Sequence, residues 1–394
     1  MTATLITGIG ELTTNDDELG RLHDAAVIIE DERIRWVGPA ARAEPTDARV
    51  DVGGRAALPG WVDSHTHLVF AGDRTAEFEA RMAGQAYSAG GIAHTVDATR
   101  AATDAELTKT VRRLVREAVS QGTTYLETKT GYGLTVDDES RCARIAAKHV
   151  DEVTFLGAHI VPPGADAEDY LATVTGPMLV AVAPVVRWVD VFCEKGAFDA
   201  TQSERVLRAA AERGLGLRVH GNQLCEGPGV ELAVRHGAAS VDHCTYLSDN
   251  DVDALAGSWR DGSAAGGTVA TLLPACDLST RQPLAPARRL LDAGAVVALA
   301  SNANPGSSYT TSMAFCVATA VLQQGLSVEE AVWAATRGGA KALRADTGDG
   351  AVGVLRPGAR ADLHVLDAPS VTHLAYRPGV PLTCAVWRNG AREC

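Results

Sequence analysis

Several features that would place this chain in other classes of protein are missing. No two of its eight cysteines form a Cys-x-x-Cys pair, which excludes a zinc knuckle and a thioredoxin-like redox motif. No uninterrupted run of about 18 apolar residues occurs, so we expect no transmembrane helix. The first four residues are not a basic segment followed by an apolar one. We therefore expect no signal peptide, and reduced thiols in the cytoplasm.

Positive charge is scarce relative to negative charge. The chain has 36 Lys and Arg against 49 Asp and Glu, a net charge of −13 at pH 7. This balance argues against nucleic acid and anionic membranes as partners. It does not argue against a small anionic substrate, because one arginine can outweigh the global charge locally. With 394 residues, 46% of them hydrophobic, the chain can bury a large core.

The middle of the chain alternates between strand and helix patterns. Short runs rich in Val, Leu and Thr, mostly bounded by Gly or Pro, predict eight strands. They cover residues 60–70, 123–129, 153–159, 188–194, 216–220, 239–244, 268–273 and 295–301. Helical stretches lie in most of the gaps, for example at 104–120, where apolar residues recur at helical spacing. This alternation predicts an α/β fold, a (β/α)8 TIM barrel.

Both ends of the chain read differently, as short strands separated by turns. Such strands occur at 25–29, 34–38, 362–367 and 385–390. Neither end can bury much surface alone. We therefore expect residues 1–57 and 347–394 to pair into one small β-sandwich, and residues 58–346 to form the barrel.

Two histidines one residue apart, His65 and His67, stand in the first predicted strand. Alternate residues of a strand point to the same face, so both imidazoles should project together. Burying them is costly unless something uses them. The pair is compatible with a metal site, since neutral imidazole is a common ligand for zinc and suits iron, or with two hydrogen-bonded core histidines.

Other predicted strands also end in polar side chains. His159 ends the third strand, His220 the fifth, Asp242 and His243 the sixth, and Asn302 follows the eighth. Catalytic groups of a TIM barrel lie at the carboxyl ends of its strands. Histidines converging on one rim therefore favour a metal site over a metal-free structural barrel.

The chain resembles the amidohydrolase superfamily over nearly its whole length, and within it the imidazolonepropionase family of histidine degradation. The superfamily motifs are the runs 58–70 and 357–363. The narrower family is indicated by Ala-Gly-Asp-Arg at 71–74, Gly-Tyr-Gly-Leu at 131–134 and Asn-Pro-Gly-Ser at 304–307. The resemblance implies metal-dependent hydrolysis of the cyclic amide C–N bond of 4-imidazolone-5-propanoate to N-formimidoyl-L-glutamate. It also implies a cytoplasmic homodimer with one divalent or trivalent ion per subunit, zinc or iron.

The resemblance further implies roles for individual residues. His65, His67 and His220 would hold the metal ion, with Asn302 at the place of the fourth ligand. His243 would polarise the substrate carbonyl or move a proton, and Gln223 would orient a ring nitrogen or water. The substrate would contact a set of loop residues: Arg74, Tyr87, Tyr132, His159, Gln223, Asn304, Gly306 and Ser307.

Two of these assignments have simpler alternatives. The planar fork of Arg74 matches a carboxylate bidentately, as a propanoate would require. The same arginine could instead pair with nearby Asp73 or Glu77. Tyr132, between two glycines, could donate a hydrogen bond to substrate or simply pack.

Asn302 is a departure from the family pattern, which has an aspartate at this place. An amide oxygen can approach a metal, but it carries no charge and accepts no proton near pH 7. Since general-base catalysis contributes about 10²–10⁴-fold, its loss should be severe. The chain could be an engineered variant, a natural homologue that moved the base to Asp242, His243 or Glu194, or a relative that binds without turnover.

Two other functions stay open at this point. The first is a related cyclic amidohydrolase or deaminase that acts on another heterocycle. The second is a non-catalytic ligand-binding homologue that kept the barrel, which only Asn302 favours.

Overall fold

The structure is a computed structural model that describes residues 3–85, 91–260 and 266–394. The chain divides into two compact units. One comprises Met1–Ser64, Arg116–Tyr125 and Ser312–Cys394, and the other comprises His65–Val115 and Leu126–Thr311. The domain limits expected from the sequence, at 57/58 and 346/347, stay a prediction.

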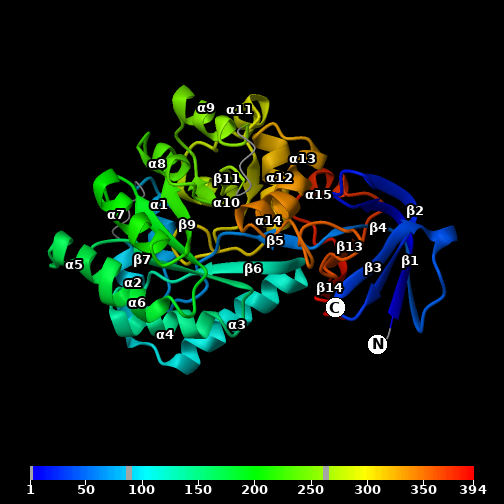
Figure 1. Cartoon of the computed structure of the whole chain (residues 1–394), viewed down its shortest axis with the longest axis horizontal. Helices are drawn as coiled ribbons and strands as arrows, with labels where there is room; N and C mark the ends of the chain where they lie inside the picture. The colour runs from blue at the N-terminus through cyan, green and yellow to red at the C-terminus, as the bar shows by residue number, and fades with distance from the viewer. Residues whose placement is uncertain (1–2, 86–90, 261–265) are drawn as a thin grey trace. The chain divides into compact units, whose positions relative to one another are not determined.

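An eight-stranded sheet carries the candidate site, and its strands follow one another in chain order (Figure 1). Its strands are β5 (Trp61–Asp63), β6 (Thr123–Lys129), β7 (Glu152–Ala158), β8 (Trp188–Cys193), β9 (Gly216–Gly221), β10 (Ser240–His243), β11 (Val269–Leu272) and β12 (Val297–Leu299). The registers from β6 to β12 are parallel. A parallel bridge between Thr66 and Ala303 brings the two ends of the sheet together. The predicted TIM barrel is thereby confirmed.

The first strand is much shorter than predicted. The sequence indicated a strand over 60–70, but β5 ends at Asp63. Beyond it, single backbone hydrogen bonds replace a continuous ladder: the His67 N–H donates to Ala303 O at 2.9 Å, and the Asn302 N–H donates to His65 O at 3.0 Å. The apolar run after the histidines is buried as loop, because it lies at the rim of the barrel and not within its wall.

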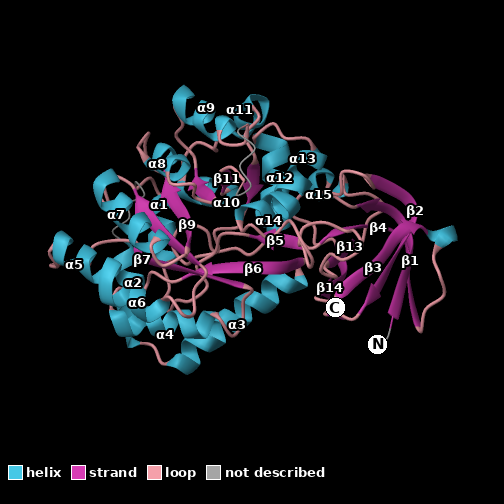
Figure 2. Cartoon of the chain, in the orientation of Figure 1, coloured by secondary structure: helices cyan, strands magenta, loops and turns pink. Residues whose placement is uncertain are grey.

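Helices fill most of the connections between the strands (Figure 2). They are α1 (Thr75–Met82), α2 (Ile92–Ala101), α3 (Asp104–Ser120), α4 (Val136–Ala146), α5 (Ala167–Thr173), α6 (Leu179–Val182), α7 (Ala200–Ala211), α8 (Gly229–Arg235), α9 (Asp249–Gly257), α10 (Pro274–Thr280), α11 (Ala287–Ala293), α12 (Met313–Gln323), α13 (Val328–Trp333), α14 (Gly339–Ala342) and α15 (His373–Tyr376). Asp199, Ser248 and Ser327 start α7, α9 and α13 with reciprocal capping boxes. These caps satisfy backbone N–H groups that a helix start leaves without partners.

The two ends of the chain pair with each other, as predicted, and build one mainly antiparallel sheet where a small β-sandwich was expected. Its strands, in spatial order, are β15 (Ala391–Arg392), β14 (Thr383–Arg388), β13 (Leu363–Leu366), β4 (Ala48–Pro59), β1 (Ala3–Thr13), β2 (Arg21–Glu30) and β3 (Arg33–Pro39). The strands form a single sheet and not the two sheets of a sandwich, because β4 pairs with both β1 and β13. Apolar residues of both ends share its core, among them Ile6, Val27 and Val365.

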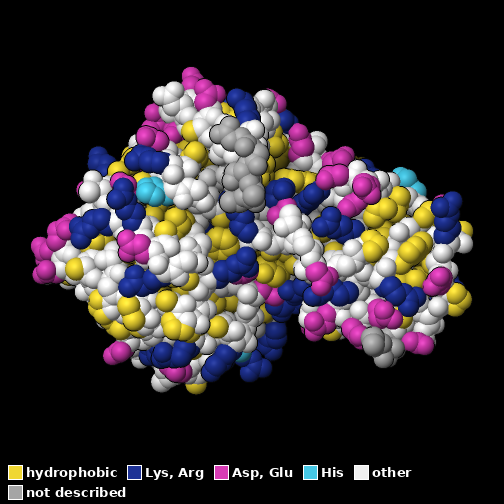
Figure 3. All heavy atoms as spheres, in the orientation of Figure 1, with side chains coloured by type: hydrophobic (Ala, Val, Ile, Leu, Met, Phe, Trp, Pro, Cys, Tyr) yellow, Lys and Arg dark blue, Asp and Glu magenta, His cyan; other side chains and the backbone are white. Residues whose placement is uncertain are grey.

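Acidic and basic side chains are interspersed over the face of the molecule that Figure 3 displays. Among the described residues, no helix is long and apolar enough to cross a membrane.

Candidate active site at the barrel rim

Four histidines lie together where the barrel strands end: His65, His67, His220 and His243, each no more than 3% exposed. The Nε2 atoms of His65 and His67 are 3.3 Å apart. Two nitrogens bound tetrahedrally to one zinc ion, each at about 2.0–2.1 Å, would be separated by about the same distance. One ring nitrogen from each of His65, His220 and His243 lies within 4.8 Å of the other two. This spacing would let His243, as well as His67, reach a cation held by His65 and His220.

Two carboxylates orient the imidazoles from behind. Nδ1–H of His65 donates to Oδ2 of Asp242 at 2.7 Å. Nδ1 of His220 lies 3.0 Å from Oδ2 of Asp190, whose Oδ1 accepts the His220 backbone N–H at 3.1 Å. A carboxylate that accepts a hydrogen bond from Nδ1–H keeps the lone pair on Nε2. Histidines that bind metal ions in proteins commonly have such a carboxylate partner. Nε2 of His220 has no hydrogen-bond partner among the described residues.

Burial keeps three of these imidazoles neutral, those of His65, His67 and His243. It is the largest cause that lowers the pKa of His65, His67 and His243 well below the ordinary value. A protonated imidazole cannot bind a metal ion, so rings that stay neutral at pH 7 suit this use. Nδ1 of His67 and Nδ1 of His243 also lack hydrogen-bond partners among the described residues.

Asn302 lies beside these rings, immediately after β12. Its backbone has φ of +53°, a left-handed conformation that asparagine tolerates better than most residues. Its side chain is 2% exposed, and Oδ1 has no hydrogen-bond partner among the described residues. A buried carbonyl oxygen without a partner costs stability, so this atom is available to a ligand.

A second convergent group, Asp190, His220 and Asp242, is less suited to a metal ion. Nζ of Lys129 lies 3.0 Å from Oδ2 of Asp190 and 3.8 Å from Oδ2 of Asp242. An ammonium group therefore already pairs with Asp190 and lies close to Asp242. A cation is therefore better placed among the histidines, including His65, than among these carboxylates.

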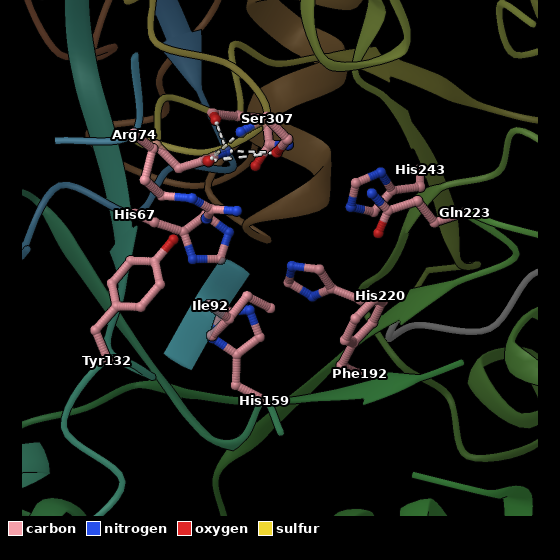
Figure 4. Close-up of a pocket in the computed structure, with 12 residues that line it drawn as sticks. His67, Arg74, Ile92, Tyr132, His159, Phe192, His220, Gln223, His243 and Ser307 are labelled. Carbon is pink, nitrogen blue, oxygen red and sulfur yellow. Dashed lines mark hydrogen bonds between the residues drawn. The ribbon is translucent and has the colours of Figure 1, made fainter. Parts of the chain in front are cut away.

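A pocket opens above the histidines, and Figure 4 shows several of the predicted side chains pointing into it. Its lining contains no carboxylate and comprises His67, Arg74, Ile92, Tyr132, His159, Phe192, His220, Gln223, His243, Asn302, Asn304 and Ser307. All the described residues that the resemblance assigned to substrate are in this lining, except Gly306. Tyr87 lies outside the described residues.

Arg74 occupies one end of the pocket, and both interpretations of it hold in part. Its Nε and Nη2 donate to the two oxygens of Glu77 at 2.8 and 2.7 Å, so the predicted ion pair with Glu77 exists. Nη1 has no hydrogen-bond partner among the described residues. The glycines at 91 and 306 make room for the guanidinium, because a Cβ at Gly306 would lie 1.9 Å from Nη1. The ion pair thus fixes an arginine that still presents a donor.

Tyr132 and His159 form another wall. Nδ1–H of His159 donates to the Gly131 carbonyl at 2.9 Å, which leaves Nε2 as an acceptor. Burial lowers the pKa of His159 to about 4, so it is neutral at pH 7. Glu139 holds the Tyr132 loop through the backbone N–H groups of Gly131, Gly133 and Leu134.

Asn304 organises its own loop. Its Oδ1 accepts the backbone N–H groups of Gly306 and Ser307, both at 2.8 Å, and its Nδ2 donates to Asn302 O at 2.6 Å. The side chain lines the pocket, yet its polar atoms are already engaged. It therefore shapes the loop that carries Gly306 and Ser307.

Asp242, Glu194 and His243, the alternatives to Asn302 as proton acceptor, differ in whether they can reach a substrate in the pocket. Oε2 of Glu194 accepts the backbone N–H groups of Gln223 and Leu224, both at 2.9 Å, so this carboxylate holds the Gln223 loop. Oδ2 of Asp242 is shared by His65 and by Arg218, at 3.1 Å. Neither carboxylate lines the pocket, whereas His243 does.

Several residues of the site were not predicted from the sequence. Glu139, Lys129, Asp190 and Arg218 contact predicted residues or the loops that carry them. A partial signal was present, since a charged residue in the middle of an otherwise apolar buried strand is unusual. Which ligand each one supports could not be read from that signal.

Comparison with known proteins gives consistent matches. A model of the amidohydrolase family matches residues 56–386. An imidazolonepropionase of Saccharopolyspora erythraea is 72% identical over 392 residues, covering 100% of this chain and 99% of that protein. One from Arthrobacter sp. (strain FB24) is 68% identical over 397 residues, with 99% of each chain covered.

Solved structures share the architecture. A triazine hydrolase from Arthobacter aurescens superposes with a TM-score of 0.76 at 20% identity, covering 100% of this chain and 94% of that one. An adenosine deaminase from Xanthomonas campestris with bound zinc gives 0.74 at 18% identity, covering 99% and 92%. At this identity the likeness concerns the fold alone.

Proposed function

Because the chain belongs to the amidohydrolase family, we propose that it hydrolyses the cyclic amide of 4-imidazolone-5-propanoate to N-formimidoyl-L-glutamate, a step of histidine degradation. Water adds to the ring carbonyl carbon, the bond from that carbon to the ring nitrogen breaks, and the nitrogen gains a proton. Full-length identity of 72% to a protein named imidazolonepropionase supports this substrate over another heterocycle.

The observation that carries the proposal is the convergence of buried, neutral imidazoles beside a pocket that ends at Arg74. The lone pair of His65, Nε2 of His67 beside it, the unpartnered Nε2 of His220 and the unpartnered Oδ1 of Asn302 fit one cation, zinc or iron, per subunit. When bound, a cation of this kind supplies Lewis acidity that activates water and polarises a carbonyl. Three imidazoles with an open position are typical of catalytic sites.

Arg74, His159 and Tyr132, which line the pocket, recognise the substrate. The free Nη1 of Arg74 donates to the propanoate carboxylate, and Glu77 holds the guanidinium plane in place. Nε2 of His159 accepts a ring N–H, because its Nδ1–H is engaged with Gly131. The Tyr132 hydroxyl points into the same space (Figure 4).

Proton transfer falls to His243. Its Nδ1 is buried without a partner among the described residues, and the ring lines the pocket. Asn302 cannot accept a proton, and the carboxylates of Asp242 and Glu194 hold other groups. His243 therefore takes the proton from water and returns it to the leaving nitrogen. The Gln223 amide orients the imidazolone ring of the substrate.

The remaining parts of the proposal rest on composition and resemblance. The resemblance to the family supports a cytoplasmic location and a homodimer. The net charge of −13 argues against nucleic acid and an anionic membrane as partners.

The test compares two substrates on purified chain loaded with zinc or with iron. Imidazolone-propanoate should be hydrolysed, whereas its neutral propanamide analogue should lose most of kcat/KM because Arg74 has no charge to bind. Formimidoyl-glutamate is quantified as product. Equal rates for the two compounds, or no product from the acid, would refute the proposal.

A further inference from the structure

Five charged side chains are enclosed within the barrel, each with 0% exposure: Glu127, Lys129, Asp190, Arg218 and Asp242. We call them the buried charge cluster. Nζ of Lys129 lies 3.0 Å from Glu127 and 3.0 Å from Asp190. Nη2 of Arg218 lies 3.1 Å from Asp242. Charges so deeply buried persist only when each is paired, and here every one is.

Two carboxylates of the cluster are shared with the candidate metal ligands. Asp242 accepts Nδ1–H of His65 at 2.7 Å, and Asp190 lies 3.0 Å from Nδ1 of His220. Each therefore stands between a cationic side chain and an imidazole. The cluster residues lie on β6, β8, β9 and β10. The last three strands are adjacent and parallel, and only β7 separates β6 from β8, so the barrel wall brings the charged groups together.

The charges of the cluster do not cancel. Three carboxylates face two cationic side chains, which leaves one excess negative charge. The proposed ligands His65, His67, His220 and Asn302 carry none. For a cation among these ligands, Asp190 and Asp242 would each supply a negative charge one imidazole away.

We propose that Asp190 and Asp242 are positioning residues for the metal ion. They hold His220 and His65 with Nε2 toward the cation, and they supply the negative charge that a carboxylate at position 302 would otherwise provide. Lys129 stabilises the cluster when no metal is bound and opposes the cation electrostatically. This inference rests on the proposed function, because it assumes that the histidines hold a metal ion.

The experiment measures the zinc dissociation constant of the full chain by competition with a chelator. Asp190→Asn and Asp242→Asn should each weaken zinc binding about 10–100-fold, the usual effect of removing a carboxylate behind a ligating histidine. The matched control is Asp346→Asn, which removes another mostly buried carboxylate, paired with Lys341 at 2.7 Å. It should bind zinc as the native chain does. Thermal melting of each metal-free variant checks that it folds.

Lys129→Met separates electrostatics from simple structural damage. Removing this positive charge should lower the melting temperature of the metal-free protein while zinc binds at least as tightly as to the native chain. If zinc binds more weakly to Lys129→Met as well, the cluster acts only through structure and the charge role is wrong. Native affinity in both aspartate variants, or equal weakening by Asp346→Asn, would also overturn the inference. A native chain that binds no zinc or iron would instead refute the proposed function itself.

Discussion

Alanine at position 306 would place a methyl group inside the guanidinium of Arg74. The added Cβ would lie 1.9 Å from Nη1 and 2.3 Å from Cζ, far inside van der Waals contact. Gly91 also lies against the guanidinium, since a Cβ there would lie 2.1 Å from Nη2. Because both glycine backbones lie so close, the guanidinium has little room to move while it keeps its two bonds to Glu77.

Gly306→Ala should consequently displace Nη1 from its position facing the pocket. A hydrogen bond to a charged group contributes about 1.5–3 kcal/mol, so kcat/KM should fall about 10–150-fold. Most of the change should appear in KM, because the propanoate is bound alike before and during the reaction. Steady-state kinetics with imidazolone-propanoate measure both constants.

Gly257→Ala is the matched control. Gly257 ends α9, nothing lies within 4 Å of where its Cβ would be, and its φ is not in the left-handed region. The control should keep native kinetics. If Gly306→Ala has a native KM for the propanoate, then Arg74 does not recognise the carboxylate and the reasoning fails.

Three further predictions concern the histidines and position 302. His243→Gln should lower kcat about 10²–10⁴-fold with zinc still bound, measured by kinetics and metal analysis, and an unchanged kcat would remove the proton-transfer role. Asn302→Asp should lower the melting temperature of the metal-free protein, because it buries an unpaired carboxylate, and added zinc should restore that temperature. A melting temperature that does not change with zinc would mean that this side chain lies away from the metal. Burial lowers the pKa of His364 to about 3, so the unfolded chain alone binds this proton between about pH 6.5 and 3. Stability is thus lost as the pH falls through 6.5, by about 1.4 kcal/mol per unit, and His364→Gln should flatten that slope in urea titrations at several pH values.

The rim of histidines could be anticipated because strand direction is a local property. In a parallel barrel every strand ends on the same side, so His159, His220 and His243 had to meet His65 and His67. The length of the first strand could not be anticipated. Its apolar run is compatible with either strand or buried loop, and only the bond between His67 and Ala303 decides between them.

Arg74 shows where local reasoning stops. From the sequence, pairing with Glu77 and recognition of a substrate were competing explanations. The structure makes them compatible, because Glu77 uses Nε and Nη2 and leaves Nη1 to the pocket. Gly306, more than 200 residues away in the chain, supplies the space.

The sequence by itself determined the fold class and the meeting of histidines at one rim, because periodicity and strand order are local patterns, while the ligand set and the unusual amide at position 302 came from the resemblance to a family. Only the tertiary structure decided which charge supports which ligand. His65 and Asp242 are 177 residues apart, and their 2.7 Å contact exists because the closed barrel enforces it. A pairing of that kind depends on the position of a whole strand relative to another, which no local pattern encodes.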